Sequence, residues 1–143
     1  MQTFLPYPSF IKSAEVLDRQ RLLKQILEVK QILNAISGDA NRAWRNHPAV
    51  LMWAGHSYSL VHYGCVMADE WLRRGYKDHV YRPYFILVME YTENTGHPKW
   101  LGDDRFHNSH QSNLVRKLPD HYLPLFPDVE LGLDYFWPTK EGY

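Results

Sequence analysis

The feature that most constrains the fold is residues 47–76, HPAVLMWAGHSYSLVHYGCVMADEWLRRGY, a stretch that is apolar on nearly every side. A helix that is apolar all round has no face suited to solvent, so the rest of the chain has to enclose it. Pro48 suits the first turn of such a helix and Gly75 suits its end. The stretch therefore predicts a buried central helix.

A long first helix is predicted over residues 14–37, with Ser13 as its N-cap and Gly38 closing it. Its apolar residues recur every three or four positions and so form one buried face: Val16, Leu22, Leu23, Ile26, Val29, Leu33 and Ile36. A polar stripe recurs at the same spacing on the other side and faces solvent or a cleft: Arg21, Lys24, Glu28 and Gln31.

The other segments are less regular. MQTFLPYPSF at residues 1–10 contains two prolines and is expected to be an extended arm packed on the body. A polar connector, SGDANRAWRNHP, joins the two long helices, and FILVMEY at residues 85–91 fits either a short strand or a buried helix. SHQSNLVRKL predicts a short helix that Pro119 stops, and the tail should wrap over the helices. The predicted fold is all-α, one compact domain over residues 1–143 with an irregular, aromatic-rich C-terminal segment.

Composition excludes several classes of protein. The formal net charge is zero, which argues against coating of nucleic acid by bulk charge but leaves room for a local basic groove. No run of about 18 apolar residues and no secretory signal is present, so we expect no membrane contact and a cytoplasmic location. The single cysteine, Cys65, cannot form an internal disulfide, and it fits a small core residue better than a reactive thiol.

The polar stripe on the first helix has two interpretations. It can be a solvated face on which Lys24 and Glu28 form an i, i+4 pair worth about 0.3–0.5 kcal/mol. Alternatively, Glu28 is a catalytic carboxylate in a cleft, with Arg21 and Lys24 beside it. The spacing alone favours the solvated face, because such pairs are common on exposed helices.

Two further segments carry polar groups that suit phosphate. Arg45 and His47 directly precede a predicted helix start, where free amides favour an anion, although a plain helix cap explains them equally well. In HNSHQSNLVRK, His110, Arg116 and Lys117 suit a phosphate backbone or a polar helix end. A metal site would need more ligands than this segment offers, so no metal is predicted. Aromatic residues in the tail, LDYFWPTKEGY, can stack on bases or pin the C-terminus to the core.

Four segments together resemble one known family. MQTFLPYPSF, LDRQRLLKQ, WRNHPAVLMWAGH and SHQSNLVRK are similar to bacterial proteins classed with the pyrimidine-dimer DNA glycosylases of the phage endonuclease V type. The resemblance extends over most of the chain. The segments most similar to the phage enzyme itself are HPAVLMWAGH and the EWLRRGY that follows it. Beyond residue 80 little of the two sequences matches.

The resemblance implies a compact all-α enzyme that cleaves the N-glycosidic bond of a damaged pyrimidine and then cuts the strand by β-elimination, without a cofactor. In that family a main-chain α-amine attacks C1′ of the sugar and a glutamate of the first helix assists, which places these roles on Met1 and Glu28. The first basic DNA contact of the helix falls on Arg21. His56 takes the histidine position of the Gly-Ala-Gly-His block.

An α-amine suits this chemistry because it titrates near 7.7–8.0, against about 10.4 for lysine, so roughly 10% of it is unprotonated at pH 7. The expected partner is damaged double-stranded DNA, bound by a monomer through Arg21, Lys24, Arg45, His47, His56, His110, Arg116 and Lys117. Two alternatives stay open: an enzyme of the same fold acting on another modified base or nucleoside, and a non-catalytic nucleic-acid-binding module.

Overall fold

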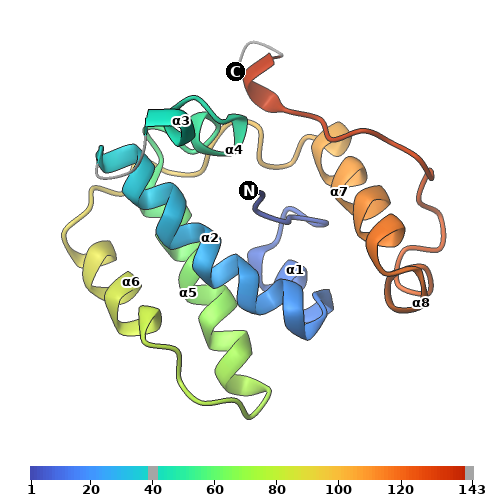
Figure 1. Ribbon diagram of the computed structural model, residues 1–143, viewed down its shortest axis with the longest axis horizontal. Helices are drawn as coiled ribbons and strands as arrows, with labels where there is room; N and C mark the ends of the chain where they lie inside the picture. The colour runs from blue at the N-terminus through green and yellow to red at the C-terminus, as the bar shows by residue number, and fades with distance from the viewer. Residues whose placement is uncertain (39–41, 141–143) are drawn as a thin grey trace.

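Two long helices, α2 (Arg19–Ser37) and α5 (Ser57–Arg73), pack side by side at the centre of the molecule (Figure 1). We describe a computed structural model, which covers residues 1–38 and 42–140. Every regular element in those two ranges is helical, as the all-α prediction requires. The other elements are α1 (Phe10–Val16), α3 (Arg42–Arg45), α4 (Pro48–Leu51), α6 (Tyr81–Glu90), α7 (Asp104–Lys117), α8 (Pro119–Tyr122) and the short 3₁₀ helix η1 (Pro138–Lys140).

The predicted start of the first helix is wrong, because the helical backbone is interrupted between α1 and α2. Leu17 is extended (φ −68°, ψ 135°), and the Asp18 carboxylate caps α2 by accepting from the Arg21 N–H. Ser13 is therefore not an N-cap. It lies inside α1, whose cap is Ser9. The predicted end is confirmed, since Gly38 closes α2 with a left-handed φ of 88°.

The predicted central helix is also divided. Pro48 occupies the first turn of a helix as predicted, but that helix, α4, ends at Leu51. Gly55 then adopts a φ of 80°, which a helix interior does not allow, and α5 begins at Ser57. The prediction of burial is confirmed for α5, where ten of 17 residues are buried.

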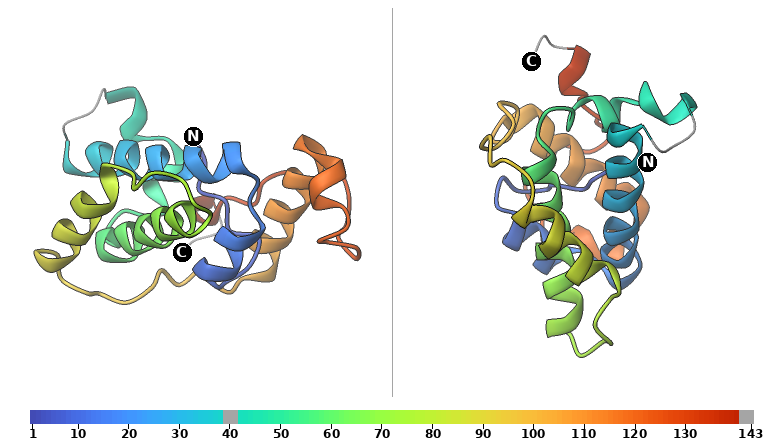
Figure 2. Two further views of the ribbon diagram at one scale, coloured as in Figure 1. Left: turned by 90° about the horizontal axis from the view of Figure 1, so that it is seen from below. Right: turned by 90° about the vertical axis from the view of Figure 1, so that its left-hand side faces the viewer.

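Residues 81–90 form a helix, α6, and not the short strand that FILVMEY also allowed. This helix is not buried either, because Phe85 is its one buried residue. Phe85 packs where Gly64 leaves space on α5: a Cβ on Gly64 would lie 2.8 Å from the Phe85 ring and 2.9 Å from Val29. Figure 2 shows α6 lying against α5 from two further sides.

The C-terminal part behaves as predicted. The predicted short helix is α7, which begins earlier than expected, at Asp104, and ends before Pro119. Beyond α8 the chain returns along α7, where Leu133 N–H donates to Ser112 Oγ at 3.0 Å and Phe136 N–H to Ser109 Oγ at 3.1 Å. The middle of the predicted connector (39–41) and the end of the tail (141–143) lie outside the described residues.

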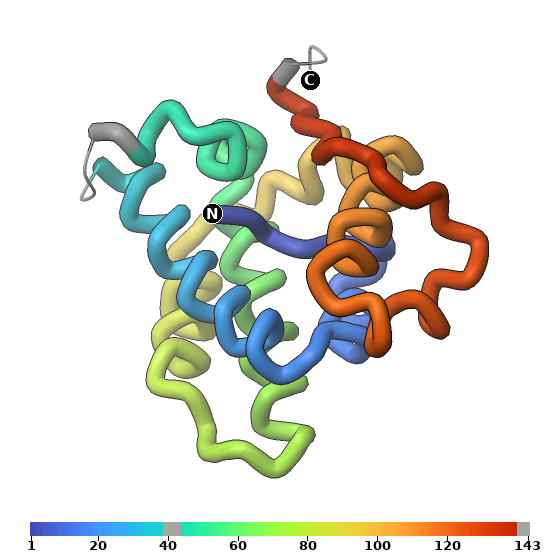
Figure 3. The backbone as a smooth tube through the Cα atoms, turned by 45° about the vertical axis from the view of Figure 1, so that its right-hand side comes forward, coloured from blue at the N-terminus to red at the C-terminus, as the bar shows by residue number. Residues whose placement is uncertain are grey.

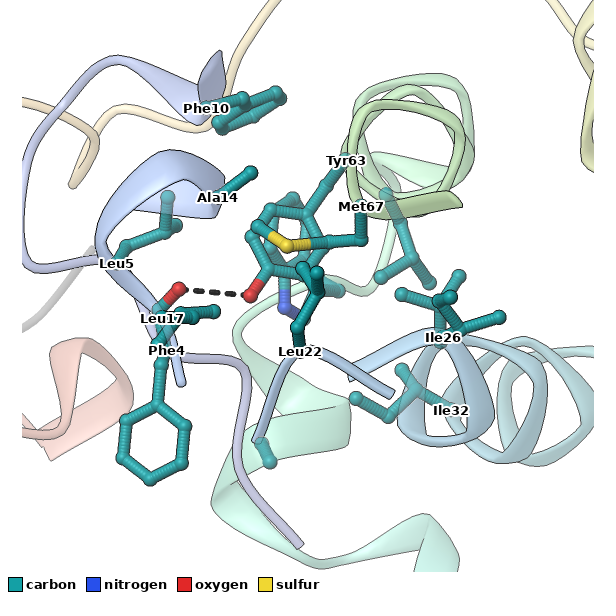
Figure 4. Close-up of a cluster of buried hydrophobic side chains, with 14 of the residues drawn as sticks. Phe4, Leu5, Phe10, Ala14, Leu17, Leu22, Ile26, Ile32, Tyr63 and Met67 are labelled. Atoms are coloured by element: carbon teal, nitrogen blue, oxygen red, sulfur yellow. Dashed lines mark hydrogen bonds between the residues drawn. The ribbon is translucent and has the colours of Figure 1, made fainter. Parts of the chain in front are cut away.

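The N-terminal arm enters the core as an extended segment. Thr3, Phe4 and Leu5 are buried, and Tyr63 of α5 donates from its hydroxyl to the Phe4 carbonyl at 2.7 Å (Figure 4). The arm passes between α2 and α7, so the N-terminus emerges beside the middle of α2 (Figure 3). Cys65 lies among core residues as predicted. None of the helices within residues 1–38 and 42–140 is long and apolar enough to cross a membrane.

Candidate active site

Glu28 is the carboxylate at the centre of the site. It lies three turns into α2, and only 5% of its surface is exposed. Its Oε1 atom lies 4.0 Å from the Lys24 ammonium, and its Oε2 accepts no hydrogen bond from the described residues. A buried carboxylate oxygen without a donor is costly for the fold. The polar stripe is thus not a solvated face at this residue.

The α-amine of Met1 lies close enough to Glu28 to affect its ionisation. Burial raises the pKa of Glu28, and the positive charges of the Met1 amine and of Lys24 lower it without fully offsetting the burial. The net pKa of Glu28 is above its ordinary value. An amine and a carboxylate that interact in this way can exchange a proton or stabilise a developing cation between them.

A cleft of about 400 Å³ surrounds these two groups. Helix α2, the N-terminal arm, α7 and the C-terminal tail all contribute to it, so residues far apart in sequence share one wall. It is lined by Met1, Gln2, Phe4, Gln20, Arg21, Lys24, Glu28, His47, Lys117, Tyr135 and Trp137. The volume is in the range of clefts that hold a ligand of nucleoside size.

Cations gather at one side of the cleft although the whole chain is neutral. Partial burial lowers the pKa of Lys117, and the nearby charges of Arg21, Lys24 and Arg116 lower it further. Arg21 is held by the Asp18 carboxylate at 3.3 Å. Four positive groups from two helices, α2 and α7, therefore produce a locally positive surface next to Glu28.

His47 reaches the cleft as a neutral hydrogen-bond donor. Its Nδ1 accepts from the Ala49 N–H at 3.0 Å, so the proton of the neutral ring is on Nε2. Burial lowers the pKa of His47, and the Met1 ammonium lowers it further. The sequence predicted a phosphate corner or a cap at this residue, and in the structure His47 both caps α4 and lines the cleft.

Three of the predicted site residues lie elsewhere. Arg45 donates to the Gly38 carbonyl at 2.9 Å, at the far end of α2, about 15 Å along the axis from Glu28. His56 precedes α5 and lines a separate cavity with Lys99 and Trp100. His110 is 0% exposed, a position from which an imidazole cannot touch phosphate, so we do not assign it a DNA contact. The structure brings together Met1, Arg21, Lys24, Glu28, His47 and Lys117, with Arg116 near Lys117.

Some residues that line the cleft were not among the site residues predicted from the sequence. Gln20 precedes Lys24 and Glu28 at intervals of four, so the helical spacing could have identified it. For the aromatic residues of the tail, the sequence did not distinguish stacking on bases from pinning the C-terminus to the core. In the structure, Tyr135 and Trp137 line the cleft. Trp137 packs edge-on against His47, with ring centres 5.9 Å apart. The described residues contain no group of three or more His, Cys, Asp or Glu side chains able to hold a metal.

Comparison with known proteins identifies a family for this chain. Residues 1–82 match the protein family described as pyrimidine dimer DNA glycosylase. The matched part, more than half of the chain, contains Met1, Glu28 and His47, whereas α7 and the tail, which supply Lys117 and Trp137, lie beyond it. No significant match is found among curated proteins or among solved structures.

Proposed function

The chain belongs to the pyrimidine dimer DNA glycosylase family, and we propose that it excises damaged pyrimidines, pyrimidine dimers in particular, from double-stranded DNA through an imine on Met1. The observation that carries the mechanism is the shared cleft of the Met1 α-amine and the buried Glu28 carboxylate. Among the described residues Glu28 Oε2 accepts no hydrogen bond, and Lys24 lies 4.0 Å from Oε1.

In the proposed reaction the unprotonated amine of Met1 attacks C1′ of the damaged nucleotide, and the bond from C1′ to the base breaks. The electron pair of that bond leaves with the base. Glu28 stabilises the positive charge that develops on the sugar and accepts the proton that the attacking amine loses. It then returns that proton to O4′ as the C1′–O4′ bond breaks and the ring opens to the imine. Loss of a proton from C2′ then expels the 3′ phosphate by β-elimination, and water releases Met1. No cofactor enters any of these steps.

The cations beside the cleft hold the phosphate backbone in this proposal. Arg21, Lys24, Arg116 and Lys117 suit phosphates on either side of the damaged nucleotide, and neutral His47 can donate to one of them. Tyr135 and Trp137 present aromatic faces on which an exposed base can stack. Extrusion of a base costs a few kcal/mol and is easiest at a damaged pair, which favours lesions over normal DNA.

Replacing Lys117 with Gln tests the phosphate contact. Each phosphate contact contributes about 0.9 to the slope of log K against log salt, so the variant should bind with a slope smaller by about that amount. Binding should weaken equally for damaged and intact duplexes, because phosphate carries no sequence or lesion information. Fluorescence anisotropy at several salt concentrations measures both. An unchanged slope would remove Lys117 from the interface, and Lys77, exposed beyond α5, is the matched control.

The main experiment traps the imine. The purified protein is incubated with ultraviolet-irradiated duplex DNA and borohydride, and the adduct is mapped by mass spectrometry, with an intact-mass check of the N-terminus. We expect a covalent adduct on Met1 that depends on irradiation. A parallel duplex with one abasic site tests the lyase step separately from base removal. Absence of an adduct with a free amine on Met1 would overturn the proposal.

A further inference from the structure

We propose that His107 and His110 of α7 form a clamp on the N-terminal arm that positions the Met1 amine against Glu28. The clamp is defined by these two imidazoles and the backbone of Leu5. Both histidines are positioning residues and touch no substrate. The inference rests on the proposed function for its role in the reaction, but the clamp itself can be tested without DNA.

The two imidazoles bind both polar backbone groups of one residue. His110 Nδ1 accepts from the Leu5 N–H at 2.9 Å. His107 Nδ1 lies 2.8 Å from the Leu5 carbonyl, while its Nε2 accepts from the Gly102 N–H at 2.9 Å. The second contact fixes the proton of neutral His107 on Nδ1, so that His107 donates to Leu5. Their spacing of three residues puts both rings on one side of α7.

The His110 contact requires a neutral ring, because Nδ1 can accept from the Leu5 N–H only when it is unprotonated. Burial, together with the charge of neighbouring His107, lowers the pKa of His110 to about 3. Burial also lowers the pKa of His107, although the Leu5 carbonyl and the carboxylates Asp104 and Asp103 act in the opposite direction. The acceptor on His110 therefore persists at neutral pH.

The opposite side of the arm is held by α2, α5 and the segment after α4. Gln25 Oε1 accepts from the Phe4 N–H at 2.8 Å, and Tyr63 donates to the Phe4 carbonyl. Trp53 Nε1 donates to Thr3 Oγ1 at 3.0 Å. Three consecutive residues of the arm are thus bound by side chains, Leu5 from α7 and Thr3 and Phe4 from the opposite side. They follow directly after Met1 and Gln2, which line the cleft.

Such a clamp sets the register of the arm, and register sets the position of the amine. Slippage by one residue would move Met1 by about 3.8 Å, the distance between consecutive Cα atoms. A displacement of 1 Å can cost a catalytic group about 100-fold in rate. Packing alone does not explain the choice of His110, because its buried Nε2 finds no acceptor among the described residues. A leucine would fill the site without that unpaired donor.

The test compares His110→Asn, whose amide oxygen can replace the Nδ1 acceptor, with His110→Leu, which has none. At saturating damaged DNA we expect the Leu variant to trap the imine at least about ten-fold more slowly, with Kd within two-fold of the unmodified protein. The Asn variant should stay within about three-fold of the unmodified rate. His121→Leu is the matched control, because His121 binds a carbonyl of α1 and not the arm. Equal rates in the Asn and Leu variants, or an unmodified rate in the Leu variant, would overturn the clamp.

A second readout needs no DNA. In protein labelled with ¹³Cα-methionine, the Met1 resonance should show a titration step from Glu28 in the unmodified protein and in His110→Asn. We expect this step to disappear in His110→Leu. If the unmodified protein traps no imine, this pattern still supports the clamp while the proposed function fails, and persistence of the step in the Leu variant overturns the clamp. If His110→Leu does not fold, His107→Asn and His107→Leu make the same comparison. The amide of Asn can replace the His107 Nδ1 donor to the Leu5 carbonyl, and Leu cannot.

Discussion

Glu28→Gln is expected to lower the rate of base excision by about 10²–10⁴-fold while DNA affinity stays within two-fold. The substitution keeps the size of the side chain and removes the negative charge, and positioned acid–base groups contribute rates of this order. Among the described residues that line the cleft, Glu28 is the one with a carboxylate, so none of these neighbours can replace it. Single-turnover cleavage of irradiated duplex and anisotropy binding measure the two quantities.

The same variant should gain stability at neutral pH. Because the pKa of Glu28 is raised in the folded protein, the unfolded chain binds fewer protons than the folded one between the ordinary pKa near 4.5 and the raised value. Stability therefore falls as pH rises through that window, and the loss remains at pH 7. Removing the charge relieves it, so thermal unfolding should shift upward for Glu28→Gln. Glu90→Gln, an exposed residue on α6, is the control that should change neither activity nor melting.

An active Glu28→Gln variant would contradict the catalytic role. A variant that loses activity and DNA binding together would instead indicate that Glu28 organises the cleft. Lost turnover, retained affinity and raised stability are expected together only when a charged group that destabilises the fold is kept because catalysis needs it.

The helices could be predicted from sequence better than the breaks between them. Apolar residues three and four apart identified α2, and apolar residues on nearly every side identified the burial of α5. The break before α2 depends on Asp18, which caps the helix and whose carboxylate accepts from the Tyr122 hydroxyl, 104 residues away. Burial would raise the pKa of Asp18, but Tyr122 and Arg21 hold it below its ordinary value. A contact so distant in sequence leaves no local pattern.

The site shows the same limit. Spacing placed Arg21, Lys24 and Glu28 on one side of a helix, but taken alone it favoured solvent over a cleft. That choice depends on the arm and on the tail, which cover this side in the folded chain. The segment SHQSN looked like an exposed polar turn of α7, yet Ser109, His110 and Ser112 are buried because they bind the backbones of the arm and the tail. Polar residues that serve as partners for extended backbone are not distinguishable from solvated ones by periodicity.

Acetylation of Met1 should reduce imine trapping to the level seen without protein. The amide that replaces the amine has neither a nucleophilic lone pair nor a positive charge. A single glycine added before Met1 leaves a free amine but carries it about 3.8 Å farther along the chain, and we expect trapping to fall by about 100-fold or more. Both proteins are compared at matched DNA occupancy, with circular dichroism as the control for folding.

The acetylated protein also separates Met1 from two other amines in the same cleft. Lys24 lies 4.0 Å from Glu28, and the lowered pKa of Lys117 makes more of its free base available than for an ordinary lysine. If acetylation leaves trapping intact, one of these lysines is the nucleophile, and Lys24→Arg and Lys117→Arg identify which, because arginine keeps the charge and forms no imine. If acetylation abolishes trapping and both arginine variants retain it, the nucleophile is Met1, and the lysines act through their charge alone.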